Sequence, residues 1–389
     1  MHNPVGESSR SRLHPVVARL AVTHFGVDWF SNSLAPLLPV LVPRLGLSLA
    51  GAGTLTMVLQ LSSSVAQVLF GGLADRGYAK ALVVGGAVTT VICLGMLGQS
   101  GSWAALVAAL VCGGLGVAAF HPAGAMLAHR YSQGRPGYSM AAYVTAGTLG
   151  FAAGPIVVAT VADRFGVAST AWLIVPGLAV VGIALARLPS FAPTASRPRG
   201  AFGFAALRPY ARPLTLLYFL VVIRGFVSAS VTTFVPVLLA RRGASVTLAA
   251  AGVASYFAGG GLGGFFGGSM ADNIGHRRVI LMSMLLPVPF LVAAPLVPPS
   301  LTLVALALAG FFLQSTLPVN VSFGQLIAPV SAATVASLLM GFAWGLGGLL
   351  VPMTGVIADR AGLEATMIGL GLVPLLGVAL AWPLPRQVR

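Results

Sequence analysis

The chain of 389 residues is 57% apolar and only 7% charged, and its mean hydropathy is +0.95. These values exclude a soluble protein of two or three domains and are typical of a polytopic membrane protein. The formal net charge of +15 does not indicate nucleic-acid binding, because the basic residues stand at the ends of apolar runs and form no patch interleaved with aromatic residues.

Apolar segments long enough to cross a bilayer follow one another along the whole chain. A bilayer core needs about 20 helical residues, and lipid offers the backbone no hydrogen-bond partners, so each such segment is expected to be helical. The sequence therefore predicts an all-α membrane protein with twelve transmembrane helices. The predicted spans are 16–42, 51–73, 81–99, 104–128, 138–162, 170–187, 213–239, 248–270, 279–297, 301–327, 334–357 and 365–383.

The distribution of basic residues predicts the orientation of these spans. Twelve spans place both termini on one side; if that side is cytoplasmic, 16 Lys and Arg residues lie inside, five lie outside and Arg224 lies within the membrane. An excess of basic residues on the cytoplasmic side is the usual bias of membrane proteins. We therefore expect an N-in/C-in, multi-pass, monomeric protein of the bacterial inner (cytoplasmic) membrane, in contact with the lipid bilayer.

The first predicted span contains an acid near its middle. Asp28 is the only one of the seven acidic residues that lies deep inside a span, and a carboxylate at that depth costs about 3 kcal/mol or more unless it is paired, hydrated or protonated. His24 stands four residues earlier, on the same helical face. The pair predicts proton coupling by Asp28 and His24, because burial favours the protonated carboxyl and histidine exchanges protons near neutral pH. The alternative is a structural acid held by a hydrogen bond between helices.

Two charged loops follow the second and eighth spans. Their sequences, GGLADRGYAK at 71–80 and GGSMADNIGHRR at 267–278, each place an aspartate before basic residues at a predicted cytoplasmic helix end. An aspartate there can bond backbone N–H groups or pair with basic side chains of the other half and so lock one face of the protein. The alternative is ordinary loop charge that keeps the topology. The predicted gating residues are Asp75, Arg76, Lys80, Asp272, Arg277 and Arg278.

Polar residues inside other spans are candidates for substrate binding. Arg224 stands near the middle of the seventh span, where an arginine needs a carboxylate, carbonyl groups, water or an anionic substrate. It either pairs with Asp28 when the site is empty, holds an anionic substrate, or extends along the bundle to water. His121 precedes Pro122 in the fourth span and is either a cavity residue or a core histidine. The remaining candidates are Gln60, Tyr143, Gln314, Asn320 and Gln325.

Other chemistry is not indicated by the sequence. Cys93 and Cys112 both fall inside predicted spans and suggest neither a disulfide nor a metal site. The run GGGLGG at 259–264 lacks the Lys-Ser/Thr of a phosphate-binding loop and is interpreted as helix packing. We therefore expect no catalytic residue, no metal site and no cofactor. Because no ATP-hydrolysing motif is present either, an ion gradient is the expected driving force.

Four aspartates mark an internal repeat. Asp75 and Asp272 are 197 positions apart, and each is followed by an aspartate in a similar stretch, Asp163 after 88 positions and Asp359 after 87. In the predicted topology the first of each pair is cytoplasmic and the second is outside, so the sub-repeats are inverted. Two halves of three plus three inverted spans are the pattern of the major facilitator fold. The predicted division is a six-helix bundle at 1–187, a cytoplasmic linker at 188–212 and a second six-helix bundle at 213–389.

The chain resembles the major facilitator superfamily over nearly its whole length. The two charged loops are similar to the family's signature G-x-x-x-D-x-x-G-R/K-R/K. Stretches within the spans resemble the fosmidomycin resistance group of bacterial drug exporters, namely THFGVDWFSNSLAPLLP (23–39), LQLSSSVAQ (59–67), AFHPAGAMLA (119–128) and GFAWGLGGL (341–349). GFAAGP at 150–155 resembles the G-x-x-x-G-P element of antiporters. That resemblance implies a hinge or seal at Gly154 and Pro155.

Together these features predict a proton-coupled efflux transporter, an antiporter that exports a small organic compound or drug by alternating access. Its expected partners are a small-molecule substrate and protons, and no nucleic acid. One alternative is a proton-coupled importer of an organic anion that uses the same proton site. An alternative of another class is a membrane receptor or sensor with a transporter fold, since fold alone does not fix function.

Overall fold

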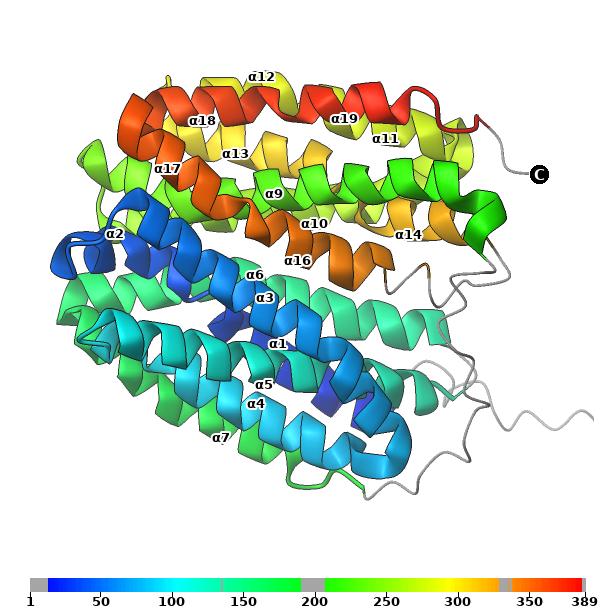
Figure 1. Cartoon of the computed structure of the whole chain (residues 1–389). Coiled ribbons are helices and arrows are strands. Elements are labelled where there is room, and N and C mark those ends of the chain that lie inside the picture. The colour runs from blue at the N-terminus through cyan, green and yellow to red at the C-terminus, as the bar shows by residue number, and fades with distance from the viewer. Residues whose placement is uncertain (1–12, 134–135, 190–206, 329–334, 336–337, 387–389) are drawn as a thin grey trace, which may run out of the picture.

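The computed structural model describes residues 13–133, 136–189, 207–328, 335 and 338–386, and over these residues it is helical without a strand (Figure 1). The helices are α1 (Pro15–Ser31), α2 (Leu34–Arg44), α3 (Leu49–Leu73), α4 (Ala79–Gly95), α5 (Trp103–Arg130), α6 (Pro136–Phe165), α7 (Ile174–Leu185), α9 (Ala211–Arg241), α10 (Val246–Ile274), α11 (His276–Leu285), α12 (Pro287–Ala293), α13 (Pro299–Gln314), α14 (Thr316–Ile327), α16 (Ala343–Leu349), α17 (Val351–Ala361), α18 (Leu363–Leu372) and α19 (Pro374–Ala381). Shorter pieces are π-helical turns at Ala74–Tyr78 and Leu338–Phe342 and 3-10 turns at Leu97–Gln99, Val167–Leu173 and Arg208–Tyr210.

Ten stretches of the described chain are long and apolar enough to cross a membrane by length and composition. The number is lower than the twelve predicted spans for two reasons. The stretch Leu49–Gln99 contains both α3 and α4, joined by a π-helical turn. The predicted span 334–357 is represented by the two shorter helices α16 and α17, and it begins among residues that lie outside the described ones.

Prolines divide several spans that the sequence predicts as continuous helices, among them 16–42 and 301–327. The ring of a proline in a helix clashes with the carbonyl group four residues earlier, which belongs to Asn32 for Pro36 and to Gln314 for Pro318. α1 ends at Ser31, and α13 ends at Gln314. The break after α13 leaves Gln314 at a helix end inside the bundle, where its side chain is buried.

The four repeat loops share one backbone feature. In each, a glycine two or three residues after the repeat aspartate adopts a positive φ angle, 99° at Gly77, 87° at Gly166, 91° at Gly275 and 87° at Gly362. Side chains other than glycine rarely adopt this conformation. The repeat seen in the sequence therefore corresponds to four equivalent turns between consecutive helices.

The helices fall into two groups that lie side by side. The first group, α1 to α7, occupies the lower part of Figure 1, and the second group, α9 to α19, occupies the upper part. They meet mainly where α6 packs against α10 and where α3 packs against α16 and α17. The chain enters α1 and leaves α19 at the same end of the molecule (Figure 1), which we call the terminal end. The loops after α2, α6, α9 and α17 lie at the opposite end, the distal end.

Within the second group, a row of glycines on α10 allows very close packing against α13. A Cβ atom on Gly259, Gly263 or Gly267 would lie 1.9 Å from the carbonyl oxygen of Ala307, Phe311 or Ser315, respectively. Gly310 of α13 meets the carbonyl oxygen of Tyr256 in the same way, at 2.0 Å. The glycine run is therefore a helix-packing surface, as the sequence predicted, because only hydrogen in place of a side chain permits this approach.

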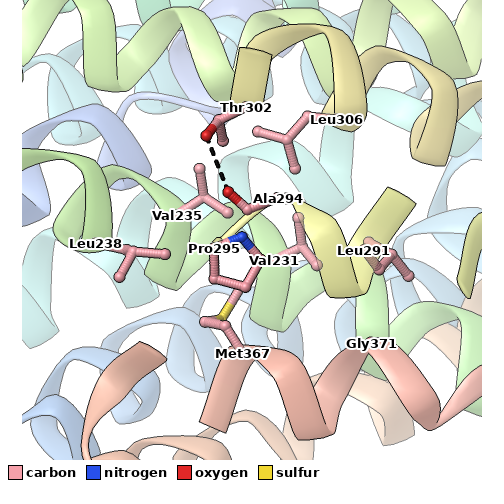
Figure 2. Close-up of a pocket in the computed structure, with 10 residues that line it drawn as sticks. All are labelled: Val231, Val235, Leu238, Leu291, Ala294, Pro295, Thr302, Leu306, Met367 and Gly371. Carbon is pink, nitrogen blue, oxygen red and sulfur yellow. Dashed lines mark hydrogen bonds between the residues drawn. The ribbon is translucent and has the colours of Figure 1, made fainter. Parts of the chain in front are cut away.

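A small cavity in the second group is wholly apolar apart from one hydroxyl (Figure 2). It lies among α9, α12, α13 and α18, and the hydroxyl of Thr302 donates to the carbonyl oxygen of Ala294 at 2.9 Å. It offers no charged or free polar group to a ligand. The cavity is therefore not a candidate functional site.

We predict that Gly263→Ala destabilises the protein, whereas Gly268→Ala does not. The first substitution places a methyl group against a backbone oxygen, and the second meets nothing within 4 Å on the same helix. Overpacking of this kind costs about 1–3 kcal/mol. Thermal unfolding of the purified proteins in detergent measures the difference, and equal melting temperatures for the two variants would contradict the packing described for α10 and α13.

Candidate functional site

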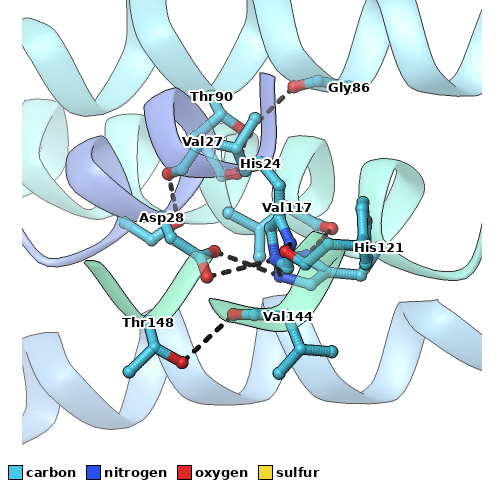
Figure 3. A network of polar contacts seen from close by, with 12 residues as sticks. His24, Val27, Asp28, Gly86, Thr90, Val117, His121, Val144 and Thr148 are labelled. Carbon is cyan, nitrogen blue, oxygen red and sulfur yellow. Dashed lines mark hydrogen bonds and ion pairs between the residues drawn. The ribbon is translucent and has the colours of Figure 1, made fainter. Parts of the chain in front are cut away.

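Three polar side chains from two helices converge within the first group. His24 and Asp28 lie on α1, and His121 lies on α5 (Figure 3). Nε2 of His24 is 3.2 Å from Oδ2 of Asp28, and Nε2 of His121 is 3.1 Å from Oδ1. The two Nε2 atoms are 3.2 Å apart. We call these three residues the proton triad.

The other nitrogen of each imidazole is fixed by the backbone. Nδ1 of His24 lies 2.8 Å from the carbonyl oxygen of Tyr143, and Nδ1 of His121 lies 2.9 Å from that of Val117. A carbonyl oxygen only accepts hydrogen bonds, so both Nδ1 atoms carry hydrogen and donate. In the neutral imidazoles Nε2 then has a lone pair, which points at the other members of the triad.

Without a cation, the triad would bring together acceptors only. Two Nε2 lone pairs and a carboxylate would face one another at 3.1 to 3.2 Å. A proton on either Nε2 turns that nitrogen into a donor and satisfies a neighbouring acceptor. The three groups are therefore placed so that they can share a proton or another cation.

The triad is enclosed on one side and approachable on another. The side chains of His24 and Asp28 are 7% and 8% exposed, whereas that of His121 is 27% exposed. The backbone of α6 covers the triad at Gly147, where a Cβ atom would lie 2.5 Å from Oδ2 of Asp28 and 2.6 Å from Nε2 of His24. Gly147 is thus needed for the triad to fit, and the sequence offered no sign of this.

Tyr143 belongs to the surroundings of the triad. Its ring stacks on His24 with a centroid separation of 4.1 Å, and its hydroxyl is buried with no hydrogen-bond partner among the described residues. α6 continues from there along α1, where Gly154 faces Trp29 so closely that a Cβ would lie 2.4 Å from the tryptophan oxygen. Gly154 and Pro155 therefore lie at a tight seam between α1 and α6, within one group of helices.

A second buried polar cluster lies in the second group and contains Arg224. Its Nη1 donates to Oε1 of Gln314 at 2.6 Å, and Nε2 of Gln314 donates to the hydroxyl of Ser228 at 3.1 Å. Ser228 and Tyr256 are joined through their hydroxyl groups at 2.7 Å. The guanidinium also lies over the ring of Trp344, 5.0 Å from its centroid.

Arg224 is deeply buried and only partly satisfied. Its exposed fraction is 1%, and its Nε is buried with no hydrogen-bond partner in the described part of the chain. Among the described residues Arg224 makes no ion pair, and the ion pairs of Asp28 are with His24 and His121. The predicted pairing of Arg224 with Asp28 is thus absent from this conformation. The Nε–H of Arg224 is therefore a buried donor without a protein acceptor among the described residues.

The remaining candidates are dispersed. Gln60 packs against Gly348 of α16, at the seam between the two groups. Asn320 on α14 is buried, and its side-chain nitrogen and oxygen lack partners among the residues described. Gln325, on the same helix, is half-buried. The structure therefore joins Gln314 to Arg224 and shows no hydrogen bond from Gln60 or Asn320 to either cluster within the described part of the chain.

Among the described residues, the predicted gating residues make no hydrogen bond or ion pair between the two groups in this conformation. Asp75, Arg76, Asp272 and Arg278 are exposed, and Lys80 is half-buried. Arg277 donates to the carbonyl oxygens of Ala381 and Trp382, which lie in its own group.

The other two repeat aspartates do connect the groups, at the distal end. Asp359 on α17 accepts hydrogen bonds from the backbone N–H groups of Leu49 and Ala50 at 2.9 and 3.0 Å, at the start of α3. Asp163 on α6 accepts from the N–H and the hydroxyl of Thr247 at 2.9 and 2.7 Å, at the start of α10. We call these two contacts the distal latches. Each places a carboxylate at the N-terminus of a helix of the other group, where negative charge is stabilised.

Membrane-length helices around buried charged groups are typical of polytopic membrane proteins. Comparison with known proteins gives the class. A family model described as the Major Facilitator Superfamily matches residues 20–352 and 217–388. The chain belongs to this superfamily, so it is a multi-pass membrane transporter of small molecules and not an enzyme.

Two curated relatives cover nearly the whole chain. The fosmidomycin resistance protein of Escherichia coli (strain K12) is 26% identical over 370 residues, which are 93% of this chain and 91% of that protein. An uncharacterized MFS-type transporter of Bacillus subtilis (strain 168) is 28% identical over 389 residues, with 97% and 94% coverage. The resemblance predicted from the sequence is confirmed.

A solved structure shows the same fold. A bacterial homologue of the human lysosomal transporter Spinster, in an inward-facing and unoccupied conformation, has a TM-score of 0.74 and 18% sequence identity. The match covers 94% of this chain and 95% of that one.

We predict that Gln314→Leu destabilises the protein more than Gln314→Glu. Leucine removes the oxygen that accepts from Arg224 at 2.6 Å and leaves a buried cation without it. An unsatisfied buried group costs about 1–3 kcal/mol, and a charged one costs more. Glutamate keeps the acceptor and adds a negative charge. Thermal unfolding in detergent measures both variants, and a melting temperature for Gln314→Leu at or above that of Gln314→Glu would show that this bond does not stabilise Arg224.

Proposed function

We propose that the protein is a proton-coupled efflux transporter that exports a small organic compound or drug by alternating access. The observation that carries the proposal is the proton triad, in which three acceptors meet and require a positive charge. The E. coli relative, whose name is fosmidomycin resistance protein, supports export over import. It also supports the choice of phosphonates as the first compounds to test.

In the proposed mechanism the two buried clusters have different ligands. The triad on α1 and α5 holds the proton, and its exposed edge at His121 is where the proton enters and leaves. Arg224 binds an anionic group of the substrate through its free Nε–H, while Gln314 and Trp344 hold the guanidinium in place. His121 is therefore reassigned from substrate binding to proton coupling.

We further propose twelve membrane spans in two six-helix halves, with both termini in the cytoplasm of a bacterial cell. Counting α3 and α4 as two spans follows from the turn at Gly77, and α16 with α17 would complete the eleventh span. The common end of α1 and α19 supports an even number of spans. The excess of basic residues predicted on that side supports its being cytoplasmic.

The contacts between the two groups support a conformation that is closed at the distal end. Besides the distal latches, the hydroxyls of Thr56 on α3 and Thr233 on α9 are 2.9 Å apart. At the terminal end, Asp75 and Asp272 have no comparable bond among the described residues. In the opposite conformation the latches would open, and the charged loops of Asp75 and Asp272 would take up the gating role that the sequence predicts.

We predict that Asp28→Asn removes proton coupling while the protein still reaches the membrane. Asparagine retains the shape of the side chain but loses the charge that holds a proton between His24 and His121. Quenching of a pH-sensitive dye in everted vesicles measures substrate-driven proton release, with fosmidomycin and other phosphonates as first substrates. Glu364→Gln, which neutralises an exposed acid far from the triad in sequence, is the matched control and should retain wild-type signals.

The same assay tests the direction of transport. Proton release from acidified vesicles on addition of substrate indicates antiport, whereas uptake of protons with substrate would identify the importer alternative. Wild-type proton release by Asp28→Asn would exclude the triad as the coupling site.

A second prediction concerns the latches. Asp163→Asn with Asp359→Asn should weaken two carboxylate contacts at helix N-termini, each worth about 1 kcal/mol. Together they amount to about 2 kcal/mol, or about a thirtyfold change in the equilibrium between the closed and the open distal end. Spin labels at Arg164→Cys and Arg360→Cys, with the native cysteines replaced, report the distance between the groups by pulsed electron resonance. We expect a longer-distance population in the double variant and none in the control Asp272→Asn; identical distance distributions in all three proteins would refute the latching role.

A further inference from the structure

We propose that His24, Asp28 and His121 also form a binding site for a divalent transition-metal cation of the zinc class. The inference uses the same three side chains as the proposed proton site, but it rests on their geometry and would stand if the protein were not an antiporter. A site of this kind was not predicted from the sequence, because His121 is 97 residues from His24 along the chain.

The spacing of the three ligand atoms fits such an ion. Nε2 of His24, Nε2 of His121 and the two carboxylate oxygens of Asp28 form contacts of 3.1 to 3.2 Å, and one ligand atom from each residue lies within 4.8 Å of the others. Zinc binds histidine nitrogen and carboxylate oxygen at about 2.0–2.2 Å in a tetrahedron, which places neighbouring ligands about 3.3 Å apart. The triad therefore needs only a small adjustment to surround an ion.

The orientation of the imidazoles is already that of metal ligands. Their Nδ1 atoms donate to the carbonyl oxygens of Tyr143 and Val117, which leaves each Nε2 lone pair available. Metal-bound histidines generally donate their second nitrogen to a carbonyl or carboxylate group in this manner, because it fixes the ring and the tautomer. These two backbone contacts hold the site in shape before any ion arrives.

A buried oxygen of Asp28 has no hydrogen to accept at the site when both imidazoles carry their hydrogen on Nδ1. Oδ1 of Asp28 is buried and accepts no hydrogen bond among the described residues, although it lies 3.1 Å from Nε2 of His121. A neutral Nε2 with its lone pair facing this oxygen repels it, and a metal ion between them would bind both.

The types of ligand atom and the access to the site determine which ions can bind. Two imidazoles and one carboxylate suit Zn²⁺, Co²⁺, Ni²⁺ or Fe²⁺, whereas Mg²⁺ and Ca²⁺ prefer oxygen ligands throughout. Gly147 closes the side toward α6, and the exposed edge of His121 leaves a direction for entry and for a fourth ligand. Three protein ligands with an open fourth position, filled by water or another small ligand, are the arrangement of zinc sites that are not purely structural. A bound ion would occupy the lone pairs that hold the proton and would therefore block proton exchange.

The test is visible absorption spectroscopy of the full-length protein with added Co²⁺. The protein is purified in detergent without a histidine tag. We expect the intense visible bands of four- or five-coordinate Co²⁺ at one equivalent, and their loss when Zn²⁺ is added. His121→Gln and Asp28→Asn should each lower the Co²⁺ affinity at least about tenfold, whereas the control His129→Gln should leave it unchanged. His121→Cys provides a substitute ligand and should add a sulfur-to-cobalt charge-transfer band, which a merely damaged protein would not show.

Two results would overturn the proposal: a wild-type spectrum of six-coordinate aqueous Co²⁺ only, or bands of equal strength in wild type, His121→Gln and Asp28→Asn. Monodispersity in size-exclusion chromatography checks that each variant is folded. The outcome is separable from that of the transport assay, which is run with a chelator. Substrate-driven proton release without Co²⁺ bands contradicts the metal site alone, and Co²⁺ bands without such release contradict the proposed function alone.

Discussion

Two imidazole nitrogens and a carboxylate, each with lone pairs, meet at 3.1 to 3.2 Å where α1 packs against α5, and this contact constrains much of the structure around it. Acceptors held so close repel one another unless a cation lies among them, and an apolar bundle strengthens that repulsion. The backbone carbonyls of Tyr143 and Val117 prevent the rings from turning away, because each binds an Nδ1 hydrogen. The carboxylate and the two imidazoles are thus held facing one another.

Small residues make this geometry possible. Gly147 lets the backbone of α6 lie against the triad, and Gly150 and Gly154 continue the contact along α1, where added Cβ atoms would come within 2.2 to 2.4 Å of backbone oxygens. A similar row on α10 fixes α13, whose end at Gln314 then reaches Arg224. Each group of helices is therefore tightly packed around one buried polar cluster. The distal latches join the groups by exposed carboxylates at helix N-termini, which are contacts that can open without disturbing either core.

The lengths of the apolar segments and the repeat aspartates were sufficient to predict an all-helical protein of this superfamily. The cost of burying a carboxylate was sufficient to identify Asp28 as a candidate site residue. His24 could be predicted as the partner of Asp28 because it stands four residues earlier on the same helix. The partnership with His121 could not be predicted, because it joins helices that are distant in the chain and no periodicity links them. Arg224 was identified by its charge, whereas Ser228, Tyr256 and Trp344, which complete its surroundings, resemble ordinary residues of a membrane helix. The distal latches were missed because nothing in the sequence around an exposed aspartate shows whether a helix of the other group begins beside it.

The central claim is that His24, Asp28 and His121 hold one shared proton, and nitrogen NMR of protein labelled in histidine tests it most directly. Spectra recorded over a pH range, with a chelator present, report the tautomer and the charge of each ring, and His24→Gln and His121→Gln assign the signals. The account predicts neutral rings that carry hydrogen on Nδ1, and two titration curves that are coupled to each other and both altered by Asp28→Asn. Neutral rings with hydrogen on Nε2, or two independent curves that do not respond to Asp28→Asn, would contradict it.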